Sequence, residues 1–296
     1  MHTSARTVLP LVVAGAALVM AGCAPEPSAS DGADGTDGVG AGPSAVSCDK
    51  GSLPAKGRGK LTVGTDKPAY APWFQDDDPA NGKGFESAVA YAVAKSLGYG
   101  KDQVVWQTVP FNNSFSPGEK KFDFDINQVS VSAERKRAVD FSSGYYTVRQ
   151  AVIALKSSPY AKAKDIAGLK KAKLGAQIGT TSLDTINDLI KPEQKPAVYQ
   201  KNDYAKSALK NGQVDAIVVD LPTAFYITSS EVKDAAIVGQ FPDVSGEAER
   251  FGLVLDKGSP LTSCVTEAVD GLRKDGTLAA LEKRWLADAA DAPVLK

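Results

Sequence analysis

The sequence predicts an α/β fold with largely parallel sheets. Short apolar runs recur from residue 60 onward, and several are followed by stretches whose apolar residues are spaced by three or four, as on one face of a helix. Strands that alternate with helices in this way build layered sheets. With roughly 100–200 residues in a typical domain, a chain of 296 residues has room for one large domain or two modest ones.

The first half of this pattern is a strand, a helix and two further strands. The first strand is expected at 61–65. The helix opens at Gly84 and closes at Gly98, and its apolar face carries Phe85, Val89, Val93 and Leu97. Further strands are expected at 104–106 and 122–126, and in the second of these apolar residues alternate with aspartates.

The second half continues the alternation. Buried strands are expected at 151–155, 174–177, 214–219 and 251–255. Helices are expected after Gly179 and at 204–211, 265–274 and 278–286. Asn202 or Asp203 can cap the helix at 204–211, and Gly212 ends it.

The N-terminus has the features of a secretory signal peptide over residues 1–22. Arg6 precedes an apolar run that is shorter than the roughly 20 residues of a transmembrane helix, and Ala21 and Gly22 come before Cys23. This ending resembles the bacterial lipobox, so a lipid on Cys23 is expected to anchor the protein to the cell membrane on its extracytoplasmic side. Ordinary secretion with an unmodified Cys23 is the alternative. Residues 23–57 are expected to form a flexible tether, because 24–46 contain almost no large apolar side chain.

The composition argues against several classes of function. The 34 Lys and Arg residues balance 35 Asp and Glu residues without a basic block, which disfavours nucleic-acid binding. The only histidine is His2, so the mature protein has no histidine for acid–base catalysis or for a metal. No cofactor and no metal are expected. Cys48 and Cys264 remain as a pair in an oxidising compartment and are expected to form a disulfide, with two buried free thiols as the alternative.

Four polar segments follow predicted strands or open predicted helices. They are 65–74, 127–135, 179–182 and 220–222. In α/β folds, ligands sit beyond the carboxyl ends of strands, where helices begin. We therefore expect a binding site that is built from these segments.

The side chains of these segments match the charges of a zwitterion. The guanidinium of Arg135 can give a carboxylate two parallel donors, and free backbone N–H groups at Thr181 and Ser182 favour the same anion. Asp220 can receive an ammonium. Apolar walls can come from Tyr70, Trp73 and Phe111. Taken singly, each has a plainer explanation, as a solvated arginine, a helix start, a turn aspartate or a core aromatic.

In order and context, these segments resemble family 3 of the bacterial solute-binding proteins, the polar amino-acid binders of ABC importers. The resemblance covers about 61–286. It rests on the segments 61–66, 84–86, 130–135, 139–142, 144–146, 179–181, 212–216, 219–222 and 272–277. It implies a two-lobed, periplasmic-binding-protein-like clamshell of type II. Lobe two, at 149–245, would be inserted into lobe one, at 58–148 and 246–296, and would close on it by a hinge.

The resemblance also implies roles for single residues. Arg135 would clamp the ligand's α-carboxylate, aided by Thr180 or Thr181. Ser130 and the backbone near Gln128 would bind from the first lobe, and Asp220 would receive the α-ammonium. The remaining expected residues surround the ligand's side chain or the pocket, namely Tyr70, Phe111, Asp66 and Glu86. Two departures from the family pattern concern ligand preference: the amides of Asn127 and Gln128, which hint at a polar ligand side chain, and an apparent loop at 112–118 in place of a helix.

The expected function is therefore amino-acid capture for an ABC importer, with permease subunits as membrane partners and a monomeric binding protein. An enzyme similar to cyclohexadienyl dehydratase is the alternative, in which Glu86 or Asp66 would act as the pocket acid. A sensory lipoprotein that hands its ligand to a receptor is a third possibility. The identity of the amino acid is not readable from the sequence.

Overall fold

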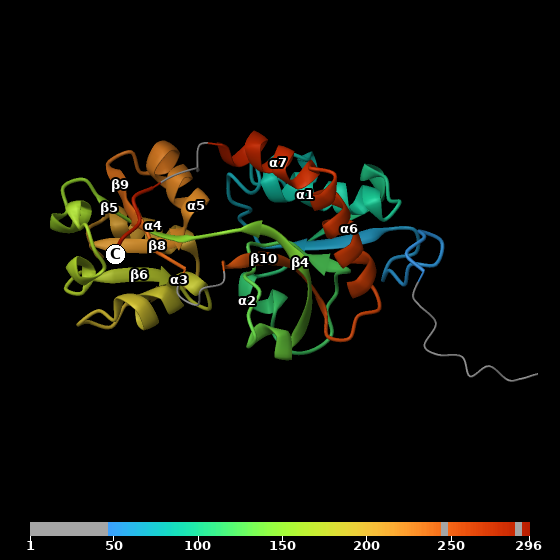
Figure 1. The fold of residues 1–296 in the computed structure, drawn as a ribbon, viewed down its shortest axis with the longest axis horizontal. Helices are drawn as coiled ribbons and strands as arrows, with labels where there is room; N and C mark the ends of the chain where they lie inside the picture. The colour runs from blue at the N-terminus through green and yellow to red at the C-terminus, as the bar shows by residue number, and fades with distance from the viewer. Residues whose placement is uncertain (1–46, 244–247, 288–291) are drawn as a thin grey trace, which may run out of the picture. The chain divides into compact units, whose positions relative to one another are not determined.

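The computed structural model describes residues 47–243, 248–287 and 292–296, which build two five-stranded sheets with helices packed on them (Figure 1). The expected signal peptide, the lipidation site at Cys23 and most of the expected tether lie outside these residues. Within the described ranges, no helix combines the length and the apolar character that a membrane crossing needs.

The first sheet has the strand order β2-β1-β3-β10-β4. Its strands are β1 (Leu61–Thr65), β2 (Val104–Thr108), β3 (Phe124–Asp125), β4 (Val139–Thr147) and β10 (Arg250–Asp256). β1 pairs in parallel with β2 and β3, whereas β10 is antiparallel to β3 and β4. Its main helices are α1 (Phe85–Ser96), α6 (Thr262–Lys274) and α7 (Thr277–Leu286). Their shared core includes Trp73, Phe85, Phe124 and Phe251, each fully buried.

The second sheet has the strand order β7-β6-β8-β5-β9. Its strands are β5 (Gln150–Leu155), β6 (Leu174–Gln177), β7 (Ala197–Tyr199), β8 (Ala216–Asp220) and β9 (Ala235–Gln240). Its helices are α3 (Thr181–Asp184), which continues as a π-helix over Thr185–Ile190, α4 (Asn202–Lys210) and α5 (Leu221–Tyr226). Separate apolar clusters, one containing Ile153 and Ile217 and the other Val152 and Val218, show that both faces of this sheet are buried.

The whole second sheet is inserted between β4 and β10 of the first sheet. The chain leaves the first sheet after Thr147 and returns to it at Arg250. The two crossing segments contact each other, because Val148 N donates a hydrogen bond to Glu249 O at 3.0 Å. This topology confirms the predicted α/β fold of two lobes with the second lobe inserted into the first. The expectation of largely parallel sheets was wrong, because both sheets are mixed: β10 is antiparallel to β3 and β4, and β5 is antiparallel to β8 and β9.

The last residues of the chain lie on the second sheet, although the expected lobe boundaries assign them to the first. Val294 pairs in parallel with Gln240 of β9, and Leu295 N donates to Gln240 O at 2.9 Å. The Leu295 side chain is 1% exposed and contacts the sheet at Gly239, where a Cβ would come within 2.7 Å of Leu295 Cγ. In Figure 1 the C-terminus accordingly lies beside the strands of the second sheet.

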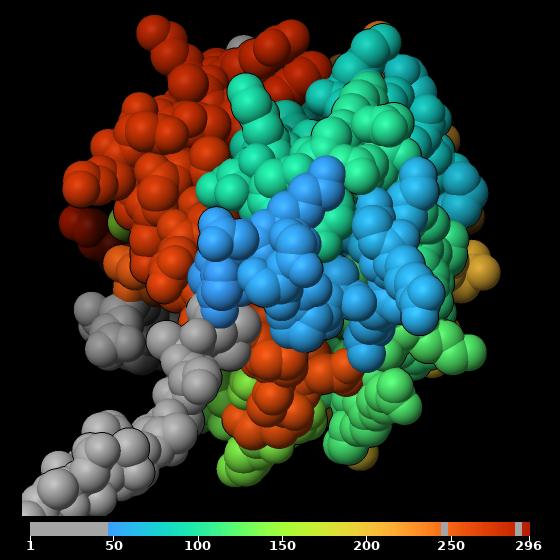
Figure 2. Space-filling view, turned by 90° about the vertical axis from the view of Figure 1, so that its right-hand side faces the viewer, coloured from blue at the N-terminus to red at the C-terminus, as the bar shows by residue number. Residues whose placement is uncertain are grey.

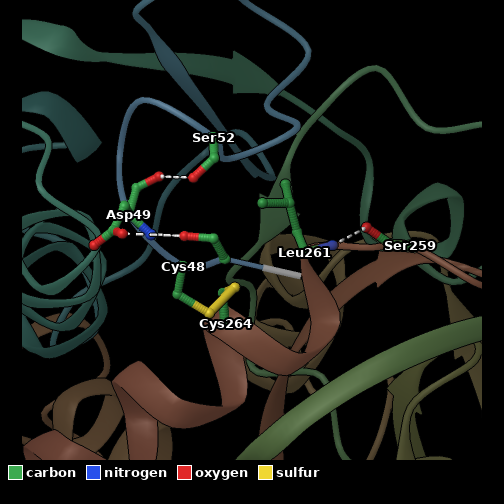
Figure 3. Close-up of a disulfide and its surroundings, with 7 residues drawn as sticks. Cys48, Asp49, Ser52, Ser259, Leu261 and Cys264 are labelled. Carbon is green, nitrogen blue, oxygen red and sulfur yellow. Dashed lines mark hydrogen bonds between the residues drawn. A yellow bond between two sulfur atoms is a disulfide. The ribbon is translucent and has the colours of Figure 1, made fainter. Parts of the chain in front are cut away.

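The chain segment that starts at Cys48 is part of the folded first lobe, although residues up to 57 were expected in the tether. Cys48 and Cys264 form the expected disulfide, with their Cα atoms 5.3 Å apart (Figure 3). Leu53 and Ala55 pack against the core of the first sheet. Figure 2 shows this N-terminal segment, in blue, against the orange C-terminal part of the chain. The disulfide therefore ties the beginning of the described chain to α6.

The segment 112–118, expected as a loop, begins with a single helical turn, α2 (Phe111–Ser114). Ser114 Oγ donates to Phe111 O at 2.7 Å and Ser116 Oγ donates to Asn112 O at 2.6 Å, which stabilises this short turn. The turn brings Phe111 and Asn112 toward the second sheet, because Asn112 Oδ1 lies 2.2 Å from the position of a Cβ at Gly179.

Candidate functional site

One cavity lies where strands of the two sheets end, as the strand-end rule predicts. Its lining from the first lobe is Thr65, Asp66, Pro68, Ala69, Tyr70, Phe74, Phe111, Asn127, Gln128, Ser130 and Arg135. Its lining from the second lobe is Gln177, Thr180, Thr181, Ser182, Asn202, Val219 and Asp220. Every predicted ligand-binding residue except Glu86 and Trp73 is in this lining.

Arg135 is buried and lies between the two lobes. A one-turn 3-10 helix holds it, and Ser132 Oγ accepts from Arg135 N at 3.1 Å. Its Nη1 donates to Ser130 O at 2.7 Å and its Nη2 donates to Gly179 O at 2.8 Å. The guanidinium also lies over the ring of Phe115, with 4.4 Å from Cζ to the ring centroid. Since a guanidinium has five N–H donors, donors remain for a ligand carboxylate.

The charge of Arg135 is balanced from both lobes. Burial lowers the pKa of Arg135, and the carboxylates of Asp184, Glu249 and Asp220 oppose this change. Several carboxyl groups therefore lie near the Arg135 guanidinium, and the carboxylate of a bound ligand would be a further one.

Asp220 ends β8 at the start of α5 and lines the cavity from the second lobe. Its Oδ1 accepts a hydrogen bond from Gln150 Nε2 at 2.8 Å. Burial, and after it the Glu249 carboxylate, raise the pKa of Asp220 to about 8, while the hydrogen bond from Gln150 opposes the increase. A carboxyl group in this state is poised to receive a cation, because a positive charge beside it would restore its ionised form.

Glu86 is beneath the cavity and not in its wall, so the expectation that it lies near the ligand needs correction. Glu86 is fully buried, and its carboxylate accepts from Gln128 N at 2.8 Å, from Gln128 Nε2 and from the Tyr145 hydroxyl. Burial raises the pKa of Glu86 to about 7, and these hydrogen bonds limit the increase. Gln128 has φ 50°, a backbone conformation that side chains rarely adopt. The hydrogen bonds to Glu86 therefore hold Gln128, which lines the cavity, in this strained backbone conformation.

The aromatic and acidic residues after β1 have different surroundings. Tyr70 lines the cavity, and Lys206 Nζ of α4 lies 5.2 Å from its ring centroid. The Asp66 carboxylate accepts from the backbone N of Lys67 at 2.6 Å and of Phe111 at 3.2 Å, so it organises the loops around it. Trp73, expected as a wall, is instead a core residue, and its Nε1 donates to Thr223 Oγ1 at 2.9 Å.

Two amides and a threonine complete the polar lining. Asn127 is 5% exposed, and its Nδ2 has no hydrogen-bond partner within the described part of the chain. Gln177 Oε1 accepts from Asn202 N at 2.9 Å. Thr180 Oγ1 caps α3 by accepting from Leu183 N at 3.2 Å, so its side chain serves the helix. The buried amide hydrogens of Asn127 therefore offer donors to a polar group in the cavity.

Sequence reasoning missed two polar residues beside the cavity, Gln150 and Glu249. Gln150 is 4% exposed, and its Oε1 accepts from Ser182 Oγ at 2.6 Å. The Glu249 carboxylate accepts from Thr181 Oγ1 at 2.7 Å and from Ser130 Oγ. Gln150 directly precedes the predicted strand at 151–155, and Glu249 lies two residues before the predicted strand at 251–255. A polar side chain beside a predicted buried strand was the available signal.

Comparison with known proteins identifies the family of this chain. A family model, the bacterial extracellular solute-binding proteins of family 3, matches residues 61–288. The chain belongs to this family. The L-cystine-binding protein TcyJ of Escherichia coli (strain K12) is 32% identical over 240 residues, which are 78% of this chain and 84% of TcyJ.

Solved structures agree with this assignment. An ancestral arginine-binding protein bound to arginine is 32% identical and superposes with a TM-score of 0.63, over 77% of this chain and 98% of the ancestral one. An ancestral amino-acid-binding protein, a precursor of cyclohexadienyl dehydratase, is 30% identical with a TM-score of 0.64, over 77% of this chain and 96% of its own. The family assignment confirms an extracytoplasmic solute-binding protein of the two-lobed fold.

Proposed function

We propose that this family member binds a free amino acid in the cavity between its lobes and delivers it to the permease of an ABC importer. The observation that carries the proposal is that one cavity is lined by a guanidinium, that of Arg135 from the first lobe, and by a carboxyl group, that of Asp220 from the second. An α-amino acid is a zwitterion, and a guanidinium and a carboxylate on opposite walls match its two charged groups. The relatives named for cystine and arginine support this class of ligand.

The proposed roles follow from the lining. Arg135 binds the α-carboxylate, with Thr181 and Ser130 beside it, and Asp220 binds the α-ammonium. Tyr70 and Phe111 flank the ligand side chain. The amides of Asn127, Gln128 and Gln177 favour a polar side chain.

The dehydratase-like alternative has less support. A catalytic acid must reach the substrate, and the carboxylate of Glu86 is enclosed by Gln128 and Tyr145 below the cavity. Asp66, the other candidate acid, is bonded to two backbone N–H groups. The cystine-binding relative carries the name of a binding protein, as does the ancestral precursor of the dehydratase. The protein is therefore a binding protein and not an enzyme.

The proposal includes the delivery of the protein to the membrane. Residues 1–22 would be removed as a signal peptide, and a lipid on Cys23 would hold the mature protein at the outer face of the membrane. The residues between Cys23 and Cys48 would act as the tether. The protein would act as a monomer, since one chain supplies both walls of the cavity.

Replacing Arg135 tests the carboxylate site. A thermal-shift screen of the common amino acids identifies the ligand, because a specific ligand stabilises the folded state. Arg135→Ala should then weaken binding by roughly 2–5 kcal/mol in isothermal calorimetry, since the ligand carboxylate would be buried without its partner. Arg135→Lys should recover only part of the loss, because an ammonium cannot make the two parallel bonds. Binding of Arg135→Ala at the wild-type affinity would remove Arg135 from the site.

A further inference from the structure

We infer that Glu249 is a built-in carboxylate that competes with the ligand for the polar groups of the cavity. This inference rests on the proposed function, because it concerns the affinity of the same cavity. Glu249 lies directly before β10, in the segment through which the chain returns to the first lobe. Its backbone carbonyl accepts from Val148 N, in the other crossing segment. Its position is therefore tied to both connections between the lobes.

The Glu249 carboxylate is bonded to both lobes. Ser130 Oγ donates to Oε1 from the first lobe, and Thr181 Oγ1 donates to the same oxygen at 2.7 Å from the second. The two hydroxyl oxygens are 3.4 Å apart. Gln150 Nε2 lies 3.3 Å from each carboxylate oxygen. One anion thus gathers three donor groups, which is the arrangement that a ligand carboxylate would need.

The competition follows from the number of hydroxyl protons. Ser130 and Thr181 line the cavity, and each hydroxyl has one proton to donate. While that proton points to Glu249, it is not available to a ligand carboxylate. Hydrogen bonds to a charged acceptor are among the stronger ones in proteins. Glu249 is not among the residues that line the cavity, although it accepts hydrogen bonds from two hydroxyls that are. A ligand that uses them must first draw their protons away from Glu249.

Glu249 also affects the link between the two lobes. Because Glu249 joins Ser130 of one lobe to Thr181 of the other, it stabilises the closed arrangement without help from a ligand. Removing its carboxylate should therefore do two things at once. It should free both hydroxyls for the ligand, and it should weaken the link between the lobes in the protein without ligand.

The opposite role, in which Glu249 assists ligand binding, gives the experiment its contrast. Gln150 Nε2 lies between the carboxylates of Asp220 and Glu249, at 2.8 Å from the first and 3.3 Å from the second. If a ligand ammonium took the place of this amide, Glu249 would assist binding. Removal of Glu249 would then weaken the complex, whereas the proposed competition predicts tighter binding.

The test compares Glu249→Ala and Glu249→Gln with wild type by isothermal calorimetry, using L-cystine, L-arginine and the tightest amino acid from the thermal-shift screen. We expect Glu249→Ala to bind its ligand about tenfold more tightly, the ratio that corresponds to one hydrogen bond to a charged group. Glu249→Gln keeps the shape but accepts more weakly, so its affinity should fall between the two. The exposed Glu267→Ala on α6 is the matched control and should bind like wild type.

Small-angle scattering of the ligand-free variants is a second measurement, and its outcome does not depend on the proposed function. Glu249→Ala should have a larger radius of gyration than wild type, and Glu267→Ala should not. If no amino acid binds any variant, the proposed function fails while scattering still tests the link. Unchanged or weaker ligand binding in a folded Glu249→Ala, or an unchanged radius of gyration, would overturn the inference. If the alanine variant does not fold, Glu249→Gln decides by the same two measurements.

Discussion

Asp220 is in a protonation state that a bound cation would change. Its pKa is raised to about 8, mainly by burial, so the carboxyl is mostly protonated at pH 7. A ligand ammonium beside it would lower that pKa. Ligand binding at pH 7 should therefore release up to one proton from Asp220, and affinity should rise as the pH increases from 6 toward 8. Calorimetry in buffers of different ionisation enthalpy measures the released protons.

Asp220→Asn is the control for this proton release. The amide keeps the shape of the side chain but cannot ionise, so binding should be weaker and the release attributed to Asp220 should disappear. Proton release of the same size in the variant would assign the titration to another group, and Glu86, whose pKa is raised to about 7, would be the next candidate.

At this scale, chemistry read from the sequence located most of the cavity. Arg135, Thr181 and Asp220 each stand where a strand ends or a helix begins, and Ser130 lies in the segment between β3 and the helical turn of Arg135. All four line the cavity. Glu86 and Trp73 could not be placed, because burial beneath a loop depends on packing between distant segments. Gln150 and Glu249 were missed for a related reason. Their partners are set by the pairing of two crossing segments that are 99 residues apart in the chain.

At the scale of elements, substitutions in the C-terminal segment test whether the end of the chain stabilises the second lobe. Leu295 is 1% exposed in the cluster that contains Ala154 and Val218, whereas the side chain of neighbouring Val294 is 42% exposed. Leu295→Ala should lower the free energy of unfolding by about 3 kcal/mol, within the range for a buried leucine. Val294→Ala should change it by well under 1 kcal/mol. Urea unfolding of the two variants makes the comparison.

A result in which both variants unfold like wild type would mean that the end of the chain does not stabilise the second lobe in solution. Ligand affinity is a useful second readout, since neither residue lines the described cavity. A loss of stability at unchanged affinity would assign Leu295 to the core alone.

Many of the longer elements followed the apolar periodicity, but the strands β4 and β9 were not predicted, and the shortest elements were not either. The expected strand at 61–65 is β1, and the helix with Phe85 and Val89 on its apolar face is α1. By contrast, the single turn of α2 and the pairing of Val294 with Gln240 involve too few residues to produce a period. Such pieces depend on long-range contacts, which a local pattern does not contain.

At the scale of the whole molecule, the insertion of one lobe into the other makes closure a property of two crossing segments and the contacts between the lobes. Alternation of strands and helices predicts two α/β layers, but resemblance to the family was needed to predict the insertion. The structure adds the contacts themselves. Trp73 Nε1 of the first lobe donates to Thr223 of the second, and Arg135 Nη2 of the first lobe donates to Gly179 O of the second.

Gly179 offers a direct test of the need for closure. It has φ +75°, and a Cβ placed there would be 2.2 Å from Asn112 Oδ1 on the opposite lobe. Gly179→Ala should therefore act as a wedge that opposes the closed arrangement but not the open one. Because Asn112 can yield only partly, we expect ligand affinity to fall by about tenfold, which corresponds to about 1.4 kcal/mol. The ligand should also reduce the radius of gyration less in this variant than in wild type.

Gly212→Ala separates the wedge from the backbone cost. Gly212 has φ +65° with no atom within 4 Å of a Cβ, so its replacement carries the same left-handed strain without a contact across the cavity. Both variants should lose a similar amount of stability, whereas only Gly179→Ala should lose ligand affinity and ligand-induced compaction. If Gly179→Ala bound its ligand and compacted like Gly212→Ala, the lobes would not need to approach as closely as the contact between Arg135 and Gly179 implies. The ligand would then be held without full closure of the cavity.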